Sequence, residues 1–297
     1  MADRLIMLGV SGGPPIFKGS AKPAIALEVA GDFYLVDCGY QTPTQIVEAG
    51  LTFDNLRGIF ITHNHLDHTS GLPGVFIHGW ASPKRIKPGV PVFTPPPAKR
   101  IVDGLKVLFG DDIQNYEVGG GLGNMPYPAA FDLEVEKGVI AKVFEDDNIS
   151  VSTVRIFHGS ELEYAYAFRI DIKHSGKSVA FSGDVAANDQ GLIELATGCD
   201  FLVHEIQDNE NVEMFTSRLP DKKEGLELRK HLFDAHTSTA DIASVALAAN
   251  AKNLVFCHYT PIPQAPEIYL EKVKPFAEKI GYSGGIIAPK DLDVIEI

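Results

Sequence analysis

The chain has 297 residues, of which 45% are hydrophobic, enough to bury the core of one large domain or two modest ones. Lysine and arginine number 26 against 39 acidic residues, a formal charge of -13, which argues against a nucleic-acid partner because phosphate binding usually needs a basic face. No apolar run approaches the roughly 20 residues that span a bilayer. The cysteines Cys38, Cys199 and Cys257 lie in apolar segments and indicate reduced thiols in a cytoplasmic protein.

The first part of the chain has the pattern of short strands followed by a helix. Apolar residues predict strands at Arg4–Val10, Ala24–Val29 and Phe33–Asp37, and Ala30-Gly31-Asp32 between the last two is typical of a hairpin turn. Pro43–Ala49 is expected to be a helix that ends at a glycine.

The next strand leads into the most informative segment of the chain. Leu56–Ile61 is an apolar run of strand length, and His63, His65, Asp67 and His68 follow within a few residues. In an extended chain His63 and His65 point the same way, and Asp67 and His68 could face a second ion. The two histidines alone could be a surface accident, but four such side chains are costly to leave in an apolar segment without a cation. Imidazole and carboxylate together suit zinc, manganese or iron better than calcium.

Two glycine-rich segments follow, and each has two interpretations. Residues 71–80 contain Phe76, His78 and Trp80 and either form a wall of a substrate pocket or pack as a helix, since Phe76 and Trp80 are four residues apart. His78 is expected to be a surface or hydrogen-bonding residue. Residues 119–128 are either a mobile flap or an ordinary surface loop.

The remaining pattern is a series of strands and helices. Strands are predicted at 90–94, 131–141, 141–144, 151–157, 164–172, 179–181, 200–204 and 253–257. Helices are predicted at 98–109, 189–196, 224–232, 242–249 and 265–280. Two β-rich halves, each ending in helices, fit an α+β fold with a four-layer αββα sandwich, formed by one domain over residues 1–297.

The pattern His63-x-His65-x-Asp67-His68 resembles the signature of the metallo-β-lactamase superfamily. The resemblance implies further metal ligands in order along the chain, and His158, Asp184 and His258 each follow a predicted strand. Carried over motif by motif, one ion is held by His63, His65 and His158, the other by Asp67, His68 and His258, and Asp184 bridges them.

The same resemblance implies a chemistry. It implies two divalent ions per chain, expected to be zinc with manganese or iron as alternatives, and a metal-bridging hydroxide as the nucleophile, which Asp67 helps to orient. Asp37-Cys38-Gly39 resembles the superfamily's first motif, in which the aspartate holds the metal loop through hydrogen bonds. The alternative for Asp37 is an aspartate that only ends a strand.

Within the superfamily, the chain is similar to the ribonuclease Z and arylsulfatase-like branch. Three segments carry this similarity: Leu202–Glu205, Ala235–Ala240 and Asn253–His258. In that branch a histidine matching His236, supported by a glutamate matching Glu205, donates a proton to the leaving group. A structural role for His236 near a helix start and a surface position for Glu205 are the alternatives. His231 is interpreted as a surface residue.

Two features favour a small substrate over transfer RNA. A short hairpin connects His158 to Asp184 where the ribonucleases have a long basic arm, and Tyr259-Thr260-Pro261 follows the last ligand. The chain is therefore expected to be a metal-dependent hydrolase of a small molecule, an aryl sulfate, carboxylic ester or lactone, with a homodimer left open. The alternative is a phosphodiesterase or a ribonuclease Z-like nuclease. A non-hydrolytic diiron protein or metal-binding scaffold is a third class.

Overall fold

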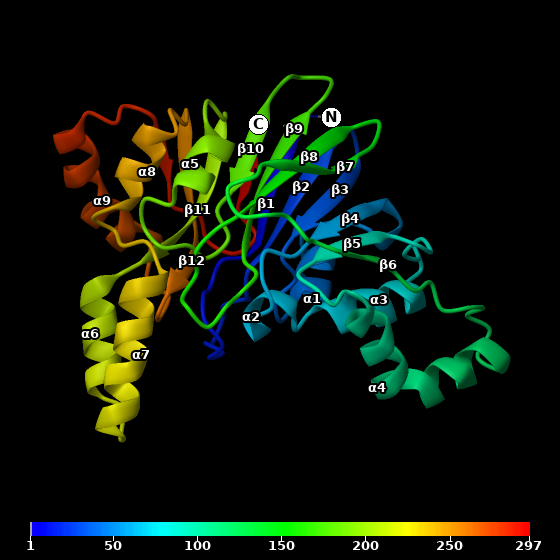
Figure 1. Cartoon of the computed structure of the whole chain (residues 1–297). Coiled ribbons are helices and arrows are strands. Elements are labelled where there is room, and N and C mark those ends of the chain that lie inside the picture. Colours follow the sequence, from blue (N-terminus) through cyan, green and yellow to red (C-terminus); the bar gives the residue numbers. More distant parts are fainter. Residues whose placement is uncertain (1) are drawn as a thin grey trace. The chain divides into compact units, whose positions relative to one another are not determined.

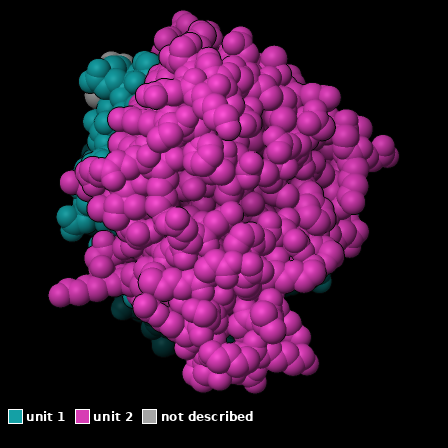
Figure 2. Space-filling model, turned by 90° about the vertical axis from the view of Figure 1, so that its left-hand side faces the viewer, with its two compact units in different colours: residues 1–9, 21–134, 291–297 teal, residues 10–20, 135–290 magenta. Residues whose placement is uncertain are grey.

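The computed structural model describes residues 2–297, which divide into two compact units (Figure 2). Unit 1 contains the described residues up to Gly9, together with Ala21–Glu134 and Asp291–Ile297, and unit 2 contains Val10–Ser20 and Val135–Lys290. Each unit is built on one seven-stranded sheet with helices (Figure 1). The single domain predicted over the whole chain stays a prediction.

The sheet of unit 1 is mixed, with the order β14-β1-β2-β3-β4-β5-β6. Its strands are β1 (Arg4–Gly9), β2 (Ala24–Val29), β3 (Asp32–Val36), β4 (Leu56–Phe60), β5 (Pro91–Thr94), β6 (Ala129–Asp132) and β14 (Val294–Glu296). The strands β14, β1, β2 and β3 pair antiparallel, and β3, β4, β5 and β6 pair parallel. The carboxyl ends of β3 and β4 therefore lie at the same edge, where the loop with the histidine motif begins.

The helices of unit 1 are α1 (Thr42–Glu48), the short α2 (Leu66–Thr69), α3 (Leu72–Ala81) and α4 (Lys99–Val118), with a 3-10 turn at Phe53–Asn55. The core packs apolar residues of the sheet, such as Phe33 and Ile59, against Phe76 and Trp80 of α3. The helical interpretation of residues 71–80 is thus confirmed for these two side chains. Residues 119–128 are packed against α4 at Met125, because its side chain is buried and its N–H donates to Glu117 of that helix at 2.8 Å.

The sheet of unit 2 has the order β13-β12-β11-β10-β9-β8-β7. Its strands are β7 (Ala141–Glu145), β8 (Ile149–Arg155), β9 (Tyr166–Ile172), β10 (Ser178–Phe181), β11 (Phe201–Gln207), β12 (Asn253–Thr260) and β13 (Gly285–Ile287). The strands β7 to β10 pair antiparallel, and β10 to β13 pair parallel. Strands β8, β10, β11 and β12 consequently run in one direction and end at one edge of the sheet.

The helices of unit 2 are α5 (Gln190–Ala196), α6 (Asn209–Ser217), α7 (Lys222–Ala235), α8 (Ile242–Ala248) and α9 (Pro266–Ile280). The predictions did not include α6, which has few apolar residues. Asp208 directly precedes it and caps it, because its carboxylate accepts from the Glu210 N–H. The strand predicted over 131–141 is wrong, because β6 ends at Asp132 and the chain then passes from unit 1 to unit 2. No helix among residues 2–297 is both long and apolar enough to cross a membrane.

Candidate active site

The histidine motif of unit 1 is held by Asp37, which follows β3. Asp37 accepts hydrogen bonds from the Thr62 N–H at 2.8 Å, from the Thr62 hydroxyl and from Nδ1 of His68 at 2.8 Å. A carboxylate only accepts hydrogen bonds, so Nδ1 of His68 carries the proton and Nε2 presents a lone pair. Asp37 has a φ of 61°, a backbone conformation that is rare for residues other than glycine. The hydrogen bonds predicted for Asp37 are therefore present.

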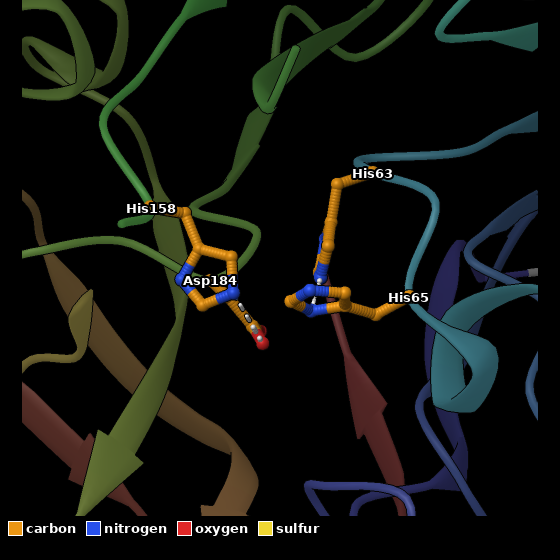
Figure 3. A group of neighbouring side chains, drawn as sticks. All are labelled: His63, His65, His158 and Asp184. Carbon is orange, nitrogen blue, oxygen red and sulfur yellow. Dashed lines mark hydrogen bonds and ion pairs between the residues drawn. The ribbon is translucent and has the colours of Figure 1, made fainter. Parts of the chain in front are cut away.

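The first two histidines of the motif present their ring nitrogens to each other. Nε2 of His63 lies 2.9 Å from Nδ1 of His65. Figure 3 shows the two rings side by side, joined by a dashed line. The Thr62 hydroxyl donates its proton to Asp37, so it accepts a hydrogen bond from Nδ1 of His63, 3.0 Å away. With the proton on Nδ1, Nε2 of His63 carries a lone pair. Two imidazole nitrogens that face each other this closely are also an arrangement that can hold a cation.

In unit 2, two histidines lie beside Asp184. His158 follows β8, and its Nδ1 donates to the Ala235 carbonyl at 3.0 Å, which leaves the Nε2 lone pair 3.7 Å from a carboxylate oxygen of Asp184 (Figure 3). Nε2 of His258 lies 3.0 Å from the same oxygen. His158, Asp184 and His258 are all at least 97% buried. Such groups are costly to bury without a cation, so the donor set of this unit fits a divalent ion.

The backbone of β12 directs His258 toward Asp184. The register between β11 and β12 shifts at this point, so that His258 is an extra residue in its strand, and its φ is 47°. A bulge of this kind changes the direction in which a side chain points. The Gly12 N–H also donates to the Tyr259 carbonyl, and a Cβ at Gly12 would lie 2.5 Å from Nδ1 of His258. The glycine thus leaves the space that the imidazole needs.

His236 and Glu205 form a second functional pair in unit 2. Both carboxylate oxygens of Glu205 lie 3.0 Å from Nδ1 of His236, and one of them also accepts from the N–H groups of Val185 and Thr237. Burial opposes the charged imidazole, but the Glu205 carboxylate, together with a smaller contribution from Asp184, more than offsets it, so the pKa of His236 is above its ordinary value. His236 directly follows α7, where the helix dipole also favours a cation.

Glu205 is fully buried inside β11, which excludes the alternative of a surface charge. His236 follows α7 and does not begin a helix, because the next helix, α8, has Asp241 at its start. His78 is exposed, as predicted. The interpretation of His231 as a surface residue was incomplete, since its ring is half-buried, pairs with Glu161 and lies edge-on to His158 at 6.0 Å.

The comparisons with known proteins agree on one family. Residues 33–259, more than half of the chain, match the family model of the Beta-lactamase superfamily domain. Ribonuclease Z of Mycobacterium marinum is 27% identical over 259 residues, which cover 86% of each chain. Ribonuclease Z of Bacillus subtilis is 28% identical over 306 residues, covering 86% of this chain and 87% of the relative. The structure of the human short-form tRNase Z has a TM-score of 0.69 at 20% identity and 99% coverage of both chains.

These findings confirm the predicted metallo-β-lactamase fold and overturn two other predictions. The small ester, lactone or sulfate substrate is wrong, because the relatives are ribonucleases, and so is the expectation of a small-molecule partner without nucleic acid. The net charge was a poor guide, since it sums over the whole surface and does not report the local field at the site. The short connection from His158 to Asp184 was likewise a poor guide, because the length of a loop does not report which bond the site cleaves.

Proposed function

The chain belongs to the β-lactamase superfamily and is a metal-dependent hydrolase, and from this premise we propose that it is a ribonuclease Z-like nuclease. Its substrate is a phosphodiester bond of RNA. The observation that carries the proposal is the pair of His236 and Glu205, in which a buried carboxylate holds an imidazole with a raised pKa. A ribose oxygen is a poor leaving group and needs such a proton donor, whereas an aryl oxygen leaves without one.

We propose the metal ligands by carrying over the family's pattern. One ion is assigned to His63, His65 and His158, the other to Asp67, His68 and His258, and Asp184 is assigned to both. Histidine and carboxylate ligands favour zinc. When bound, two such ions supply Lewis acidity toward the phosphate and lower the pKa of water. The hydrogen bonds that Nδ1 of His63, His68 and His158 makes, which turn Nε2 of each ring toward the candidate site, support this assignment.

The protein's own groups then orient the ligands and move the proton. Asp37 and Thr62 fix the rings of His68 and His63, and fixed ligands of this kind bind metal more tightly. Asp67 orients the attacking water. His236 donates its proton to the leaving ribose oxygen, and Glu205 keeps the imidazole protonated and in place.

The test compares substrate classes on protein of defined metal content. A precursor transfer RNA with a 3′ trailer and bis(p-nitrophenyl) phosphate should both be cleaved, and a chelator should abolish both activities. His65→Ala should lose metal and activity together, while the matched control His78→Ala, at an exposed histidine of α3, should keep both. The proposal would be refuted if the protein left the RNA uncleaved and efficiently hydrolysed an aryl sulfate or a lactone.

A further inference from the structure

Unit 1 contains a cavity of about 360 Å³ that neither the metal ligands nor the proton donor uses. It lies among the histidine loop, the end of β5 and the first turns of α3 and α4. Its lining includes Asn64, Leu72, Arg100, Ile101, Gly104 and Leu105. Ligand pockets in proteins usually measure roughly 300–1,000 Å³, so this one has room for a small group.

The cavity shares its wall with the candidate metal loop. Asn64 stands between His63 and His65 in the chain, and Thr69 directly follows His68. The Arg100 guanidinium of α4 donates to Oδ1 of Asn64, which ties the helix to this loop. A group bound at Asn64 is therefore held within one residue of two candidate metal ligands.

The chemistry of the lining is apolar with one positive charge. Leu72, Ile101, Leu105 and Leu108 supply apolar surface, and Arg100 is the single charged side chain among the described lining residues. An apolar slot with a guanidinium at its rim fits a flat group with apolar faces that carries an anion. Since Gly104 has no side chain, the slot stays open along α4.

We infer that this cavity binds one nucleotide of the RNA, the one next to the bond that is cleaved. The base enters the apolar slot, and Arg100 exchanges the Asn64 oxygen for the phosphate of that nucleotide. Arg100 and Gly104 are then positioning residues. The inference rests on the proposed nuclease function and adds a subsite to it.

Two glycines of α4 offer a matched pair of variants. A Cβ at Gly104 or at Gly110 would meet no atom within 4 Å, and neither residue has a positive φ. Leucine is a better helix former than glycine at both positions, so both variants should fold. Only Gly104 lines the cavity, so Gly104→Leu fills the slot and Gly110→Leu does not.

The affinities of adenosine 5′-monophosphate and ribose 5-phosphate for the metal-loaded protein should be measured by calorimetry. The unaltered protein should bind the nucleotide at least tenfold more tightly, because ribose phosphate lacks the base. Gly104→Leu should lose this preference and Gly110→Leu should keep it. Arg100→Met should weaken both ligands several-fold, and Lys99→Met, at the neighbouring exposed lysine, should not. Equal nucleotide affinity of the two leucine variants, or no preference in the unaltered protein, would overturn the inference.

Cleavage assays separate the failure of this inference from the failure of the nuclease function. RNA with an abasic nucleotide beside the cut should show a KM at least tenfold higher than intact RNA, and the Gly104→Leu protein should not distinguish them. Equal KM values in the unaltered protein would remove the subsite and leave the nuclease function standing. If no RNA is cleaved, the nuclease function fails, and the leucine variants still decide from nucleotide affinity whether the cavity binds a base.

Discussion

Replacing Glu205 by glutamine separates the chemistry of His236 from the stability of the fold. One carboxylate oxygen of Glu205 accepts from Val185 and Thr237, and both oxygens face Nδ1 of His236. The glutamine oxygen can keep the two backbone hydrogen bonds, and the amide group takes the place of the other oxygen. An amide nitrogen donates, so it faces Nδ1 with a proton where the carboxylate offered a lone pair.

The expected magnitude follows from these contacts. With both backbone N–H groups still paired, Glu205→Gln should lower the free energy of unfolding by only about 1–2 kcal/mol, whereas Glu205→Ala leaves buried donors unpaired at about 1–3 kcal/mol each. The pKa of His236 should fall, because the Glu205 carboxylate is what raises it against burial. If the pKa of His236 falls by one, the protonated imidazole becomes less stable relative to the neutral form by about 1.4 kcal/mol. A general acid contributes about 100- to 10,000-fold, which sets the upper bound of the loss.

The assay compares leaving groups. On RNA, whose ribose oxygen leaves poorly, kcat of Glu205→Gln should fall about 100-fold or more, and on bis(p-nitrophenyl) phosphate it should fall less than about tenfold. Metal content should not change. The control is Glu210→Gln, at an exposed carboxylate of α6, which should leave both rates unchanged. An equal fall on both substrates would refute the role of His236 as a proton donor.

Three further variants test contacts outside the His236 and Glu205 pair. Asp37→Asn should bind metal about 10- to 100-fold more weakly, because the imidazole of His68 loses its carboxylate partner. Competition with a chelator measures this affinity. Gly12→Ala should lower metal content, since its Cβ would lie 2.5 Å from His258, while Gly110→Ala should not. Burial opposes the charged Asp208, but Lys272 at 2.8 Å offsets it and lowers the pKa of Asp208. The charged Asp208 therefore stabilises the fold fully above about pH 3.9, the pKa of aspartate in the unfolded chain. This stabilisation is lost as pH falls through the lower pKa of the folded protein. Asp208→Asn should therefore reduce stability in urea at pH 7 by about 1–3 kcal/mol and by less at pH 2.

The sequence could predict where the candidate site residues lie, because short apolar strands lead up to them. His63, His158 and Asp184 come after β4, β8 and β10, and His258 lies near the end of β12. Within each unit parallel strands bring their carboxyl ends to one edge. The strand pattern therefore indicated the ends where polar side chains gather, and the resemblance to the metallo-β-lactamase superfamily selected His158, Asp184 and His258 among them. The hydrogen bonds of Asp37 were implied by the resemblance of Asp37-Cys38-Gly39 to the superfamily's first motif. The parallel pairing of β3 with β4 brings Asp37 beside the loop that follows β4.

The features that the sequence did not predict depend on contacts between distant segments. Helix α4 continues to Val118, beyond the predicted end at Phe109, although only Leu105 and Ile113 are buried along it. A largely solvated helix carries little apolar periodicity, so its length is not visible in the pattern. The contact between Arg100 and Asn64 joins residues 36 positions apart, and neither has a local signal. The cavity that Arg100 and Asn64 line could therefore not be predicted from the sequence.

The cavity that we assign to a nucleotide leads to a last prediction, about salt. Arg100 is the single charged side chain among its described lining residues, so this subsite can neutralise one phosphate. For single strands the slope of log K against log salt is about -0.7 for each neutralised phosphate. If Arg100 neutralises one phosphate, Arg100→Met should make the slope less negative by about 0.7, as fluorescence anisotropy of a labelled trailer RNA can measure. Lys99→Met should not change it. An unchanged slope in Arg100→Met would show that the guanidinium binds no phosphate and that RNA is held by other groups.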